Sequence, residues 1–217
     1  PDPNFRQAVE KFMGVGPEGW FTAADAQART GNFDCSGLNI GSLEGIEFLP
    51  NITALWCDNN QLTSLDLSSN TALERLYCYT NQLTSLILPN TESLYLIYAF
   101  KNQLSTLDVT GLPSLNYLRI QLNQINDISS FVAQSGLNAG DLVDLRLNNL
   151  DYEDGDDILA LKDRIGTGFL YSPQNAYSPY VPIPSADNIN TITNFPDPNF
   201  RNAVEEFMGV GSGGWFT

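Results

Sequence analysis

The sequence contains an internal repeat with a fixed step of 21 residues. The triplet Asn-Gln-Leu begins at Asn60, Asn81 and Asn102, and Asn-Gln-Ile begins at Asn123. A period in the twenties is typical of a solenoid, in which each repeat is one turn stacked on the next. The residues around each triplet fit the leucine-rich-repeat pattern L-x-L-x-x-N-x-L, with Cys or Ala accepted at the second apolar position. Four repeats in phase therefore predict a leucine-rich-repeat solenoid.

Each turn of the solenoid, called a rung below, should supply one short parallel strand, and stacking should bury its apolar side chains. We expect these strands at 55–57, 76–78, 97–99 and 118–120, about 4.8 Å apart on the concave face. Because the return path is short, the convex side should be extended or 3₁₀. Three further apolar rows follow the period: Leu65, Leu86, Leu107 and Ile128; Leu67, Leu88 and Val109; and Leu73, Leu94, Leu115 and Leu142.

The repeated asparagines (Asn60, Asn81, Asn102 and Asn123), called the Asn ladder below, should lie inside the turn that follows each strand. An amide there can hydrogen-bond backbone groups that the turn leaves unpaired. The glutamines beside them could form a ladder of amides or face water, and both interpretations remain open.

Two flanking rungs are degenerate in sequence. Residues 33–40 align with the series but place Leu38 at the Asn position, and residues 145–150 align with Leu150 there. Atypical terminal repeats are expected in solenoids because they cap the core. This alignment makes the interval between the fourth regular rung and the last rung six residues longer than 21. We expect a short helix at 130–135 in this interval, with Ser129 or Ser130 as its N-cap.

Helical caps are predicted at both ends of the solenoid. Asp2 should cap a first helix that ends at Gly14, and Thr22 a second one over 23–29. After the repeats, Asp156 or Asp157 should open a helix that Gly166 ends, followed by a strand at 169–171. The resulting division is a helical N-terminal cap at 1–32, a solenoid of about six rungs at 33–150, a C-terminal cap at 151–172, a linker or docked strap rich in Pro, Tyr and Asn at 173–195, and a further segment at 196–217.

Residues 196–217 repeat residues 1–22 with four changes, at an offset of 195 residues. We interpret this copy as the start of the next module's N-terminal cap. On this interpretation, the chain is one segment of a longer tandem array. The alternative is a single helix duplicated at the end of a domain. The copied helix could pack on the C-terminal end of this module or belong to the next one, and both possibilities stay open.

Composition excludes several classes of function. The 25 acidic and 10 basic residues give a net charge of −15, which argues against binding to nucleic acid or anionic lipid. No apolar run is long enough to span a bilayer, so we expect no membrane insertion. The chain has no histidine, which excludes a histidine-based triad or metal site, and we expect no catalytic residues.

The three cysteines, Cys35, Cys57 and Cys78, fall in one inward column on consecutive rungs. Stacked strands would bring them within disulfide range, but buried free cysteine is also common and behaves as a small apolar residue. We expect reduced core thiols.

Alternation along the strands should turn a set of aromatic side chains towards solvent on the concave face. Trp56, Tyr77, Tyr98, Arg119 and Arg146 should form a middle column. It should be flanked on one side by Asp58, Tyr79, Phe100, Gln121 and Asn148, and on the other by Ala54, Arg75, Leu96, Tyr117 and Asp144. The predicted binding residues are Trp56, Tyr77, Tyr79, Tyr98, Phe100, Tyr117, Arg119 and Arg146. An exposed apolar patch often marks an interaction site, but aromatic stacking that only stabilises neighbouring strands is the alternative.

An acidic stretch before the last helix is the only candidate metal site. Asp151, Glu153, Asp154 and Asp156 suggest calcium, but the glycine lies one position early for an EF-hand loop. Acidic residues are also favoured at any helix N-terminus, and on that interpretation the chain holds no metal or other cofactor.

Residues 1–172 resemble bacterial extracellular leucine-rich-repeat proteins of the internalin-like class. The resemblance rests on the cap sequence at 1–6 and on the first repeat at 37–46, and the cysteine-containing rungs look most like surface proteins of the Bacteroidetes. It implies a non-enzymatic, extracellular or cell-surface module. We expect protein–protein association within a tandem array, with surface or fibre (filament) structure and self-assembly from other copies or modules of the chain. The alternative is an adhesin that binds a foreign protein or glycan on the concave face.

Overall fold

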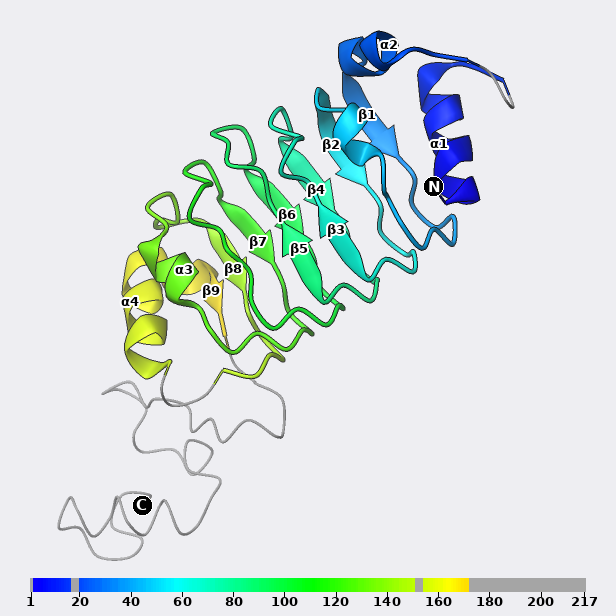
Figure 1. Cartoon of the computed structure of the whole chain (residues 1–217). Coiled ribbons are helices and arrows are strands. Elements are labelled where there is room, and N and C mark those ends of the chain that lie inside the picture. Colours follow the sequence, from blue (N-terminus) through cyan, green and yellow to red (C-terminus); the bar gives the residue numbers. More distant parts are fainter. Residues whose placement is uncertain (1, 17–19, 151–153, 172–217) are drawn as a thin grey trace, which may run out of the picture.

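The computed structural model describes residues 2–16, 20–150 and 154–171, and its main feature is a parallel sheet that runs the length of a solenoid. Figure 1 shows the strands stacked along the molecule, with helices at both ends. The strands, in sheet order, are β1 (Gly31–Asp34), β2 (Ile52–Trp56), β4 (Arg75–Tyr77), β6 (Leu96–Tyr98), β7 (Tyr117–Arg119), β8 (Leu142–Asp144) and β9 (Phe169–Leu170). The predicted leucine-rich-repeat solenoid is confirmed.

The 21-residue period produces an in-register stack. Leu55 pairs with Leu76, Leu76 with Ile97, and Ile97 with Leu118, each on the central position of its strand. These side chains are fully buried, and so are the cysteines and alanine two positions later. Because alternate residues point to opposite faces of a strand, the residues between them face the concave side.

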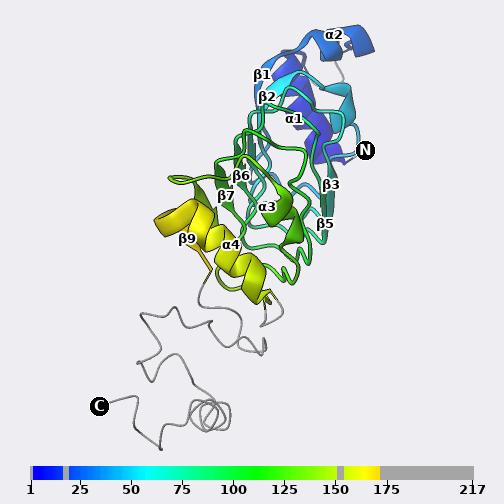
Figure 2. The ribbon, with the colours of Figure 1, turned by 90° about the vertical axis from the view of Figure 1, so that its left-hand side faces the viewer.

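The convex side is extended, as predicted. β3 (Ser64–Asp66) and β5 (Ser85–Ile87) form a second, two-stranded parallel sheet with Leu65 paired to Leu86. Figure 2 shows this pair on the opposite side of the solenoid from β6 and β7. A 3₁₀ turn, η1 (Ile46–Phe48), lies near the first rung. Most members of the predicted apolar rows are buried, so the core is continuous from rung to rung.

The N-terminal cap consists of α1 (Pro3–Met13) and α2 (Ala23–Ala28). Asp2 is the N-cap of α1, and Gly14 ends it with a positive φ of 75° that glycine adopts readily. Thr22 and Asp25 form a capping box on α2, which stops one residue before Arg29. Both predicted helices are therefore present.

The C-terminal cap consists of α3 (Ser129–Ala133), α4 (Gly155–Ile165), the 3₁₀ turn η2 (Gly166–Gly168) and β9. Ile158, Leu161 and Ile165 are buried on one face of α4, and Gly166 ends the helix, as expected. Two predicted N-caps were wrong. Ile128 occupies the cap position of α3, and the Asp127 carboxylate accepts the Ser129 N–H. Asp154, not Asp156 or Asp157, stands at the cap position of α4.

The predicted alignment of the last rung was wrong by two residues. Val143, not Leu145, pairs with Leu118, so the last step is lengthened by four residues (143 − 118 = 25, against 21) rather than six. Asn148 therefore occupies the Asn position, and Leu150 is an ordinary buried core residue. Leu142 pairs with Tyr117 on the concave face instead of extending a core row. At the other end, Phe33 pairs with Leu55, which places Leu38 at the Asn position as predicted.

The three cysteines are free and fully buried in neighbouring rungs. Burial raises the pKa of the Cys35 thiol to about 12 and also raises the pKa of Cys57 and Cys78. Such thiols remain protonated and unreactive near neutral pH.

Several predictions fall outside the described residues: the strap at 173–195 and the copied segment at 196–217. In the part of the chain that is described, no helix is long and apolar enough to cross a membrane.

Candidate functional site on the concave face

The middle column of the concave face is a row of aromatic rings held by strand register. Trp56, Tyr77, Tyr98 and Arg119 lie beside one another on β2, β4, β6 and β7. Each is partly buried and partly accessible. The parallel register repeats the same position on each strand, so the sequence period alone brings these side chains together.

The rings of this column contact one another. Trp56 and Tyr77 are stacked with centroids 5.4 Å apart and planes 4° apart, and Tyr77 meets Tyr98 edge-on at 5.4 Å and 84°. The Arg119 guanidinium lies 5.1 Å from the Tyr98 centroid, and that of Arg75 lies 5.9 Å from the Trp56 centroid. The column is therefore a continuous row of rings with a cation at each end.

A second aromatic pair lies beside the first column. Tyr79 and Phe100 stack with centroids 4.6 Å apart and planes 4° apart, and Phe100 lies 6.5 Å from Tyr98. Burial, together with a hydrogen bond to Asp58, raises the pKa of Tyr79. Burial also raises the pKa of Tyr77, although the nearby Arg75 opposes the shift. Both phenols thus stay neutral near neutral pH.

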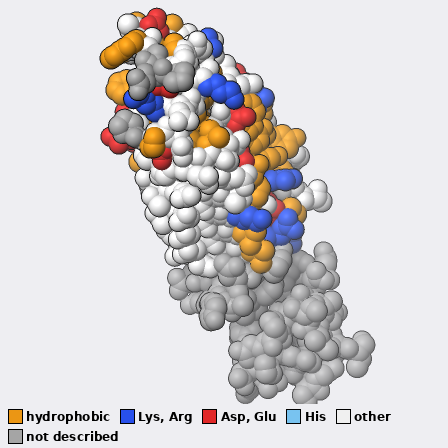
Figure 3. All heavy atoms as spheres, turned by 90° about the vertical axis from the view of Figure 1, so that its right-hand side faces the viewer, with side chains coloured by type: hydrophobic (Ala, Val, Ile, Leu, Met, Phe, Trp, Pro, Cys, Tyr) orange, Lys and Arg blue, Asp and Glu red, His pale blue; other side chains and the backbone are white. Residues whose placement is uncertain are grey.

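Tyr117, in the third column, is 45% exposed. We call the set Trp56, Tyr77, Tyr79, Tyr98, Phe100 and Tyr117 the concave aromatic surface. Figure 3 shows hydrophobic side chains, with several Lys or Arg side chains among them, gathered along the edge of the molecule that carries the sheet.

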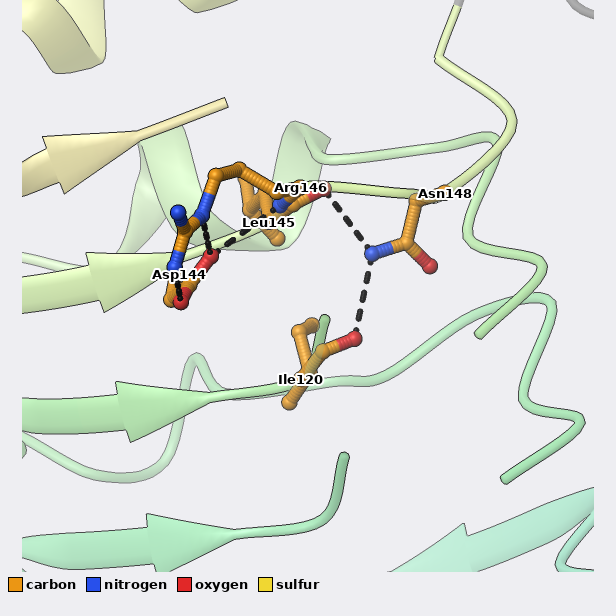
Figure 4. Close-up of polar contacts among 5 residues, drawn as sticks. All are labelled: Ile120, Asp144, Leu145, Arg146 and Asn148. Atoms are coloured by element: carbon orange, nitrogen blue, oxygen red, sulfur yellow. Dashed lines mark hydrogen bonds and ion pairs between the residues drawn. The ribbon is translucent and has the colours of Figure 1, made fainter. Parts of the chain in front are cut away.

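The revised register changes three predicted positions at the end of the surface. Asp144, not Arg146, is paired with Arg119 in the middle column. Arg146 donates from Nη2 to Asp144 Oδ2 at 2.7 Å and from Nε to Oδ1 at 2.9 Å (Figure 4), and this hydrogen bonding raises the pKa of the guanidinium. Asn148 is fully buried and does not face the concave side.

The Asn ladder joins each rung to the one before it. Asn102 donates to Cys78 O and Ala99 O, each at 3.0 Å, and accepts the Leu83 N–H at 3.0 Å. Asn81 and Asn123 make the corresponding bonds one rung earlier and later. Asn60 accepts from two residues, Leu38 and Ile40, because the first rung has no asparagine of its own.

Asn148 is a fifth member of the ladder that the sequence reasoning missed. It donates to Ile120 O at 3.0 Å and Leu145 O at 2.9 Å (Figure 4), and accepts the Ile125 N–H at 2.9 Å. Asn148 follows Val143 by five residues, the same interval as from Leu55 to Asn60, and this interval was the available signal. The ladder glutamines Gln61, Gln82, Gln103 and Gln124 are all exposed, which favours side chains that face water.

Both interpretations of the aromatics fit this geometry. The rings stack on their neighbours and so contribute to strand packing. They also remain partly accessible, and stacked rings held by a rigid sheet need little further ordering when a partner binds. The arrangement supports strands and offers a preformed contact surface.

The predicted calcium residues are only partly within the described chain. Asp154 is at the N-cap position of α4 and Asp156 is in its first turn, where the helix dipole favours a carboxylate. Asp151 and Glu153 lie outside the described residues. Among the residues that are described, no group of three or more acidic or cysteine side chains is arranged to hold a metal ion.

No protein-family model and no curated protein matches the sequence. Among solved structures, the functional domain of InlJ from Listeria monocytogenes, described as including a cysteine ladder, is similar. It has a TM-score of 0.57 and 28% identity, covering 70% of this chain and 37% of that one. Internalins InlF and InlC2 of the same species share the fold, each with a TM-score of 0.50, at 21% and 23% identity.

This chain spans 37% of the InlJ structure and 54% of the InlF structure, whereas it spans 82% of the InlC2 structure. These matches cover 70%, 75% and 76% of this chain. The chain is therefore a leucine-rich-repeat solenoid that resembles the Listeria internalins, which confirms the resemblance indicated by its sequence.

Proposed function

We propose that this chain is a non-enzymatic module for protein–protein association and that its concave aromatic surface makes the contact. The observation that carries the proposal is the row of mutually stacked, partly accessible rings, bounded by Arg75 and Arg119. Tyr, Trp and Arg are the residues that dominate binding energy at interfaces. Solenoids of this type also use their extended concave face for binding.

The proposed partner is another copy or module of the same chain, in an extracellular tandem array that builds a surface or fibre. Two observations favour it. Residues 196–217 repeat residues 1–22, the pattern expected if a second module follows in a tandem array. The chain also carries a net charge of −15, yet Arg75 and Arg119 stand at the two ends of the row of rings on the concave side. An acidic surface of a second copy therefore complements this face.

Sedimentation velocity over a concentration series tests this proposal with the full chain. The wild type should associate as concentration rises, and Trp56→Ala/Tyr98→Ala should remain monomeric. The matched control is Phe48→Ala/Ile87→Ala, which removes two apolar side chains that lie outside the concave aromatic surface and are 55% and 49% exposed. This control should associate like the wild type. A wild type that stays monomeric, or a concave variant that associates normally, would contradict self-association through this face.

The second candidate is an adhesin that binds a foreign protein or glycan on the same surface. It is favoured by the partly accessible aromatic rings, because a sugar ring can pack against an aromatic side chain much as a second aromatic ring does. A glycan array probed with the wild type and with Trp56→Ala/Tyr98→Ala distinguishes the two functions. Binding that depends on these two residues, from a chain that stays monomeric, would favour the adhesin.

A further inference from the structure

Helix α1 closes the first rung through a small set of side chains. The Asp2 carboxylate accepts the Gly41 N–H at 2.7 Å, and the Asn4 amide donates to Asn39 O at 3.5 Å. The same carboxylate accepts the N–H groups of Asn4 and Phe5 at the start of the helix. Asp2 thus both caps α1 and fixes it to the turn that follows β1.

The apolar part of this contact is centred on Phe33 of β1. The Phe5 and Phe12 rings lie 6.1 Å and 5.0 Å from the Phe33 ring, which is fully buried. Arg29 places its guanidinium 5.1 Å from the Phe12 centroid and donates to Phe12 O at 2.6 Å. We call Phe33, Asn39, Gly41 and Arg29 the cap seat, because together they hold α1 in place.

The copied segment keeps every side chain that α1 uses on the cap seat. Asp2, Asn4, Phe5 and Phe12 correspond to Asp197, Asn199, Phe200 and Phe207. The four changes fall elsewhere. Asn202 replaces Gln7 and Glu206 replaces Lys11, and both of these α1 residues are exposed. The other two replace Pro17 and Glu18, which lie outside the described residues. The copy is therefore altered only where α1 makes no recorded contact with the seat.

We propose that residues 197–209 are a second competent cap, and that their partner is the cap seat of a solenoid of this sequence. This inference rests on the self-association proposed above. It places the contact at the end of the solenoid rather than on the concave face, so an experiment can contradict either contact without contradicting the other. The 25 residues between Tyr171 and Asp197 can span up to about 80 Å when extended. The sheet from β1 to β9 measures about 30 Å at standard strand spacing. The tail can thus reach the cap seat of its own chain as well as that of a neighbour.

The test weakens each cap separately in the full chain and follows thermal unfolding. Phe200→Ala/Phe207→Ala should leave the midpoint close to that of the wild type, because α1 still occupies the seat. Phe5→Ala/Phe12→Ala should lower it moderately, since the tail then takes the seat. Combining all four substitutions should lower the midpoint by at least about 5 °C more, the scale expected for lost buried rings in a chain of this size.

A matched control adds Asn202→Ala/Glu206→Ala to Phe5→Ala/Phe12→Ala. These positions correspond to the exposed face of α1, so the midpoint should not fall further. If Phe5→Ala/Phe12→Ala has the same midpoint with and without the added Phe200→Ala/Phe207→Ala substitutions, the proposal is overturned. A Phe5→Ala/Phe12→Ala chain that does not fold would also overturn it, because the tail then fails to replace α1. Concave substitutions should leave the whole pattern unchanged, which separates this result from the proposed function.

Discussion

Replacing Asn102 by alanine should destabilise the solenoid strongly. Asn102 lies in the middle of the Asn ladder, where it accepts the buried Leu83 N–H and donates to two carbonyl oxygens. The carbonyls are partly protected, because Cys78 O also accepts from Asn81 and Ala99 O also accepts from Asn123. No such second partner is recorded for the Leu83 N–H.

The magnitude follows from these contacts. One buried N–H left unpaired costs about 1–3 kcal/mol, and two lost hydrogen bonds cost about 0.5–1.5 kcal/mol each. The free energy of unfolding should therefore fall by about 2–6 kcal/mol, a large share of the roughly 5–15 kcal/mol typical of a domain.

Urea unfolding followed by circular dichroism measures this loss, provided that the slope of the transition stays that of the wild type. Gln103→Ala is the matched control, because Gln103 is the exposed neighbour of Asn102 in the same turn. Its effect should stay within about 0.5 kcal/mol. An Asn102→Ala loss that is no larger than the control's would refute the view that the ladder holds the rungs together.

Further predictions concern the thiols, the caps and the acidic loop. Cys35, Cys57 and Cys78 should resist an alkylating reagent at pH 8 until the protein is unfolded, because burial raises the pKa of each thiol. Mass spectrometry of the treated protein measures the labelling, and rapid labelling of the native chain would contradict this prediction. The hydrogen bond from the Gly41 N–H lowers the pKa of Asp2, so its stabilising effect should be complete above the usual value of 3.8 and be lost as pH falls through the lower folded value. The difference between the thermal melts of wild type and Asp2→Asn should therefore stay constant above pH 3.8 and shrink only as pH falls below that value, and a difference that persists to lower pH would be the contrary result. Gly136→Ala would bring a methyl group against the Pro113 carbonyl and should cost about 1–3 kcal/mol, whereas Gly16→Ala, with open space around it, should be nearly neutral in urea titrations. The melting temperature should not change on addition of a chelator, and a clear decrease would instead support calcium at the Asp154 and Asp156 loop.

The sequence predicts most of this fold because one period specifies both pairing and burial. Once Leu55, Leu76, Ile97 and Leu118 are placed in register, the inward cysteines and the outward aromatics follow from strand alternation. The last rung was misplaced because Val143-Asp144-Leu145 and Leu145-Arg146-Leu147 both fit the apolar pattern. The apolar pattern is thus ambiguous after an insertion, and the position of Asn148 is the stronger guide.

The detailed geometry of the candidate site was not predictable in the same way. Register brings Trp56 beside Tyr77 and Tyr79 beside Phe100, but whether rings stack flat or meet edge-on depends on side-chain rotamers. The pairing of Arg146 with Asp144 depended on the corrected register. The cap of α3 was missed because Ile128, rather than a serine, takes the cap position, and the Asp127 carboxylate accepts the Ser129 N–H at the start of the helix.

Iodide quenching of Trp56 tests the proposed contact surface most directly. The chain has three tryptophans, and Trp20→Phe with Trp215→Phe leaves Trp56 as the only one to report. If copies associate through the concave aromatic surface, quenching of Trp56 should decrease as protein concentration rises through the range where sedimentation shows assembly. Quenching that stays constant while the chain assembles would contradict the proposal that this surface is the interface.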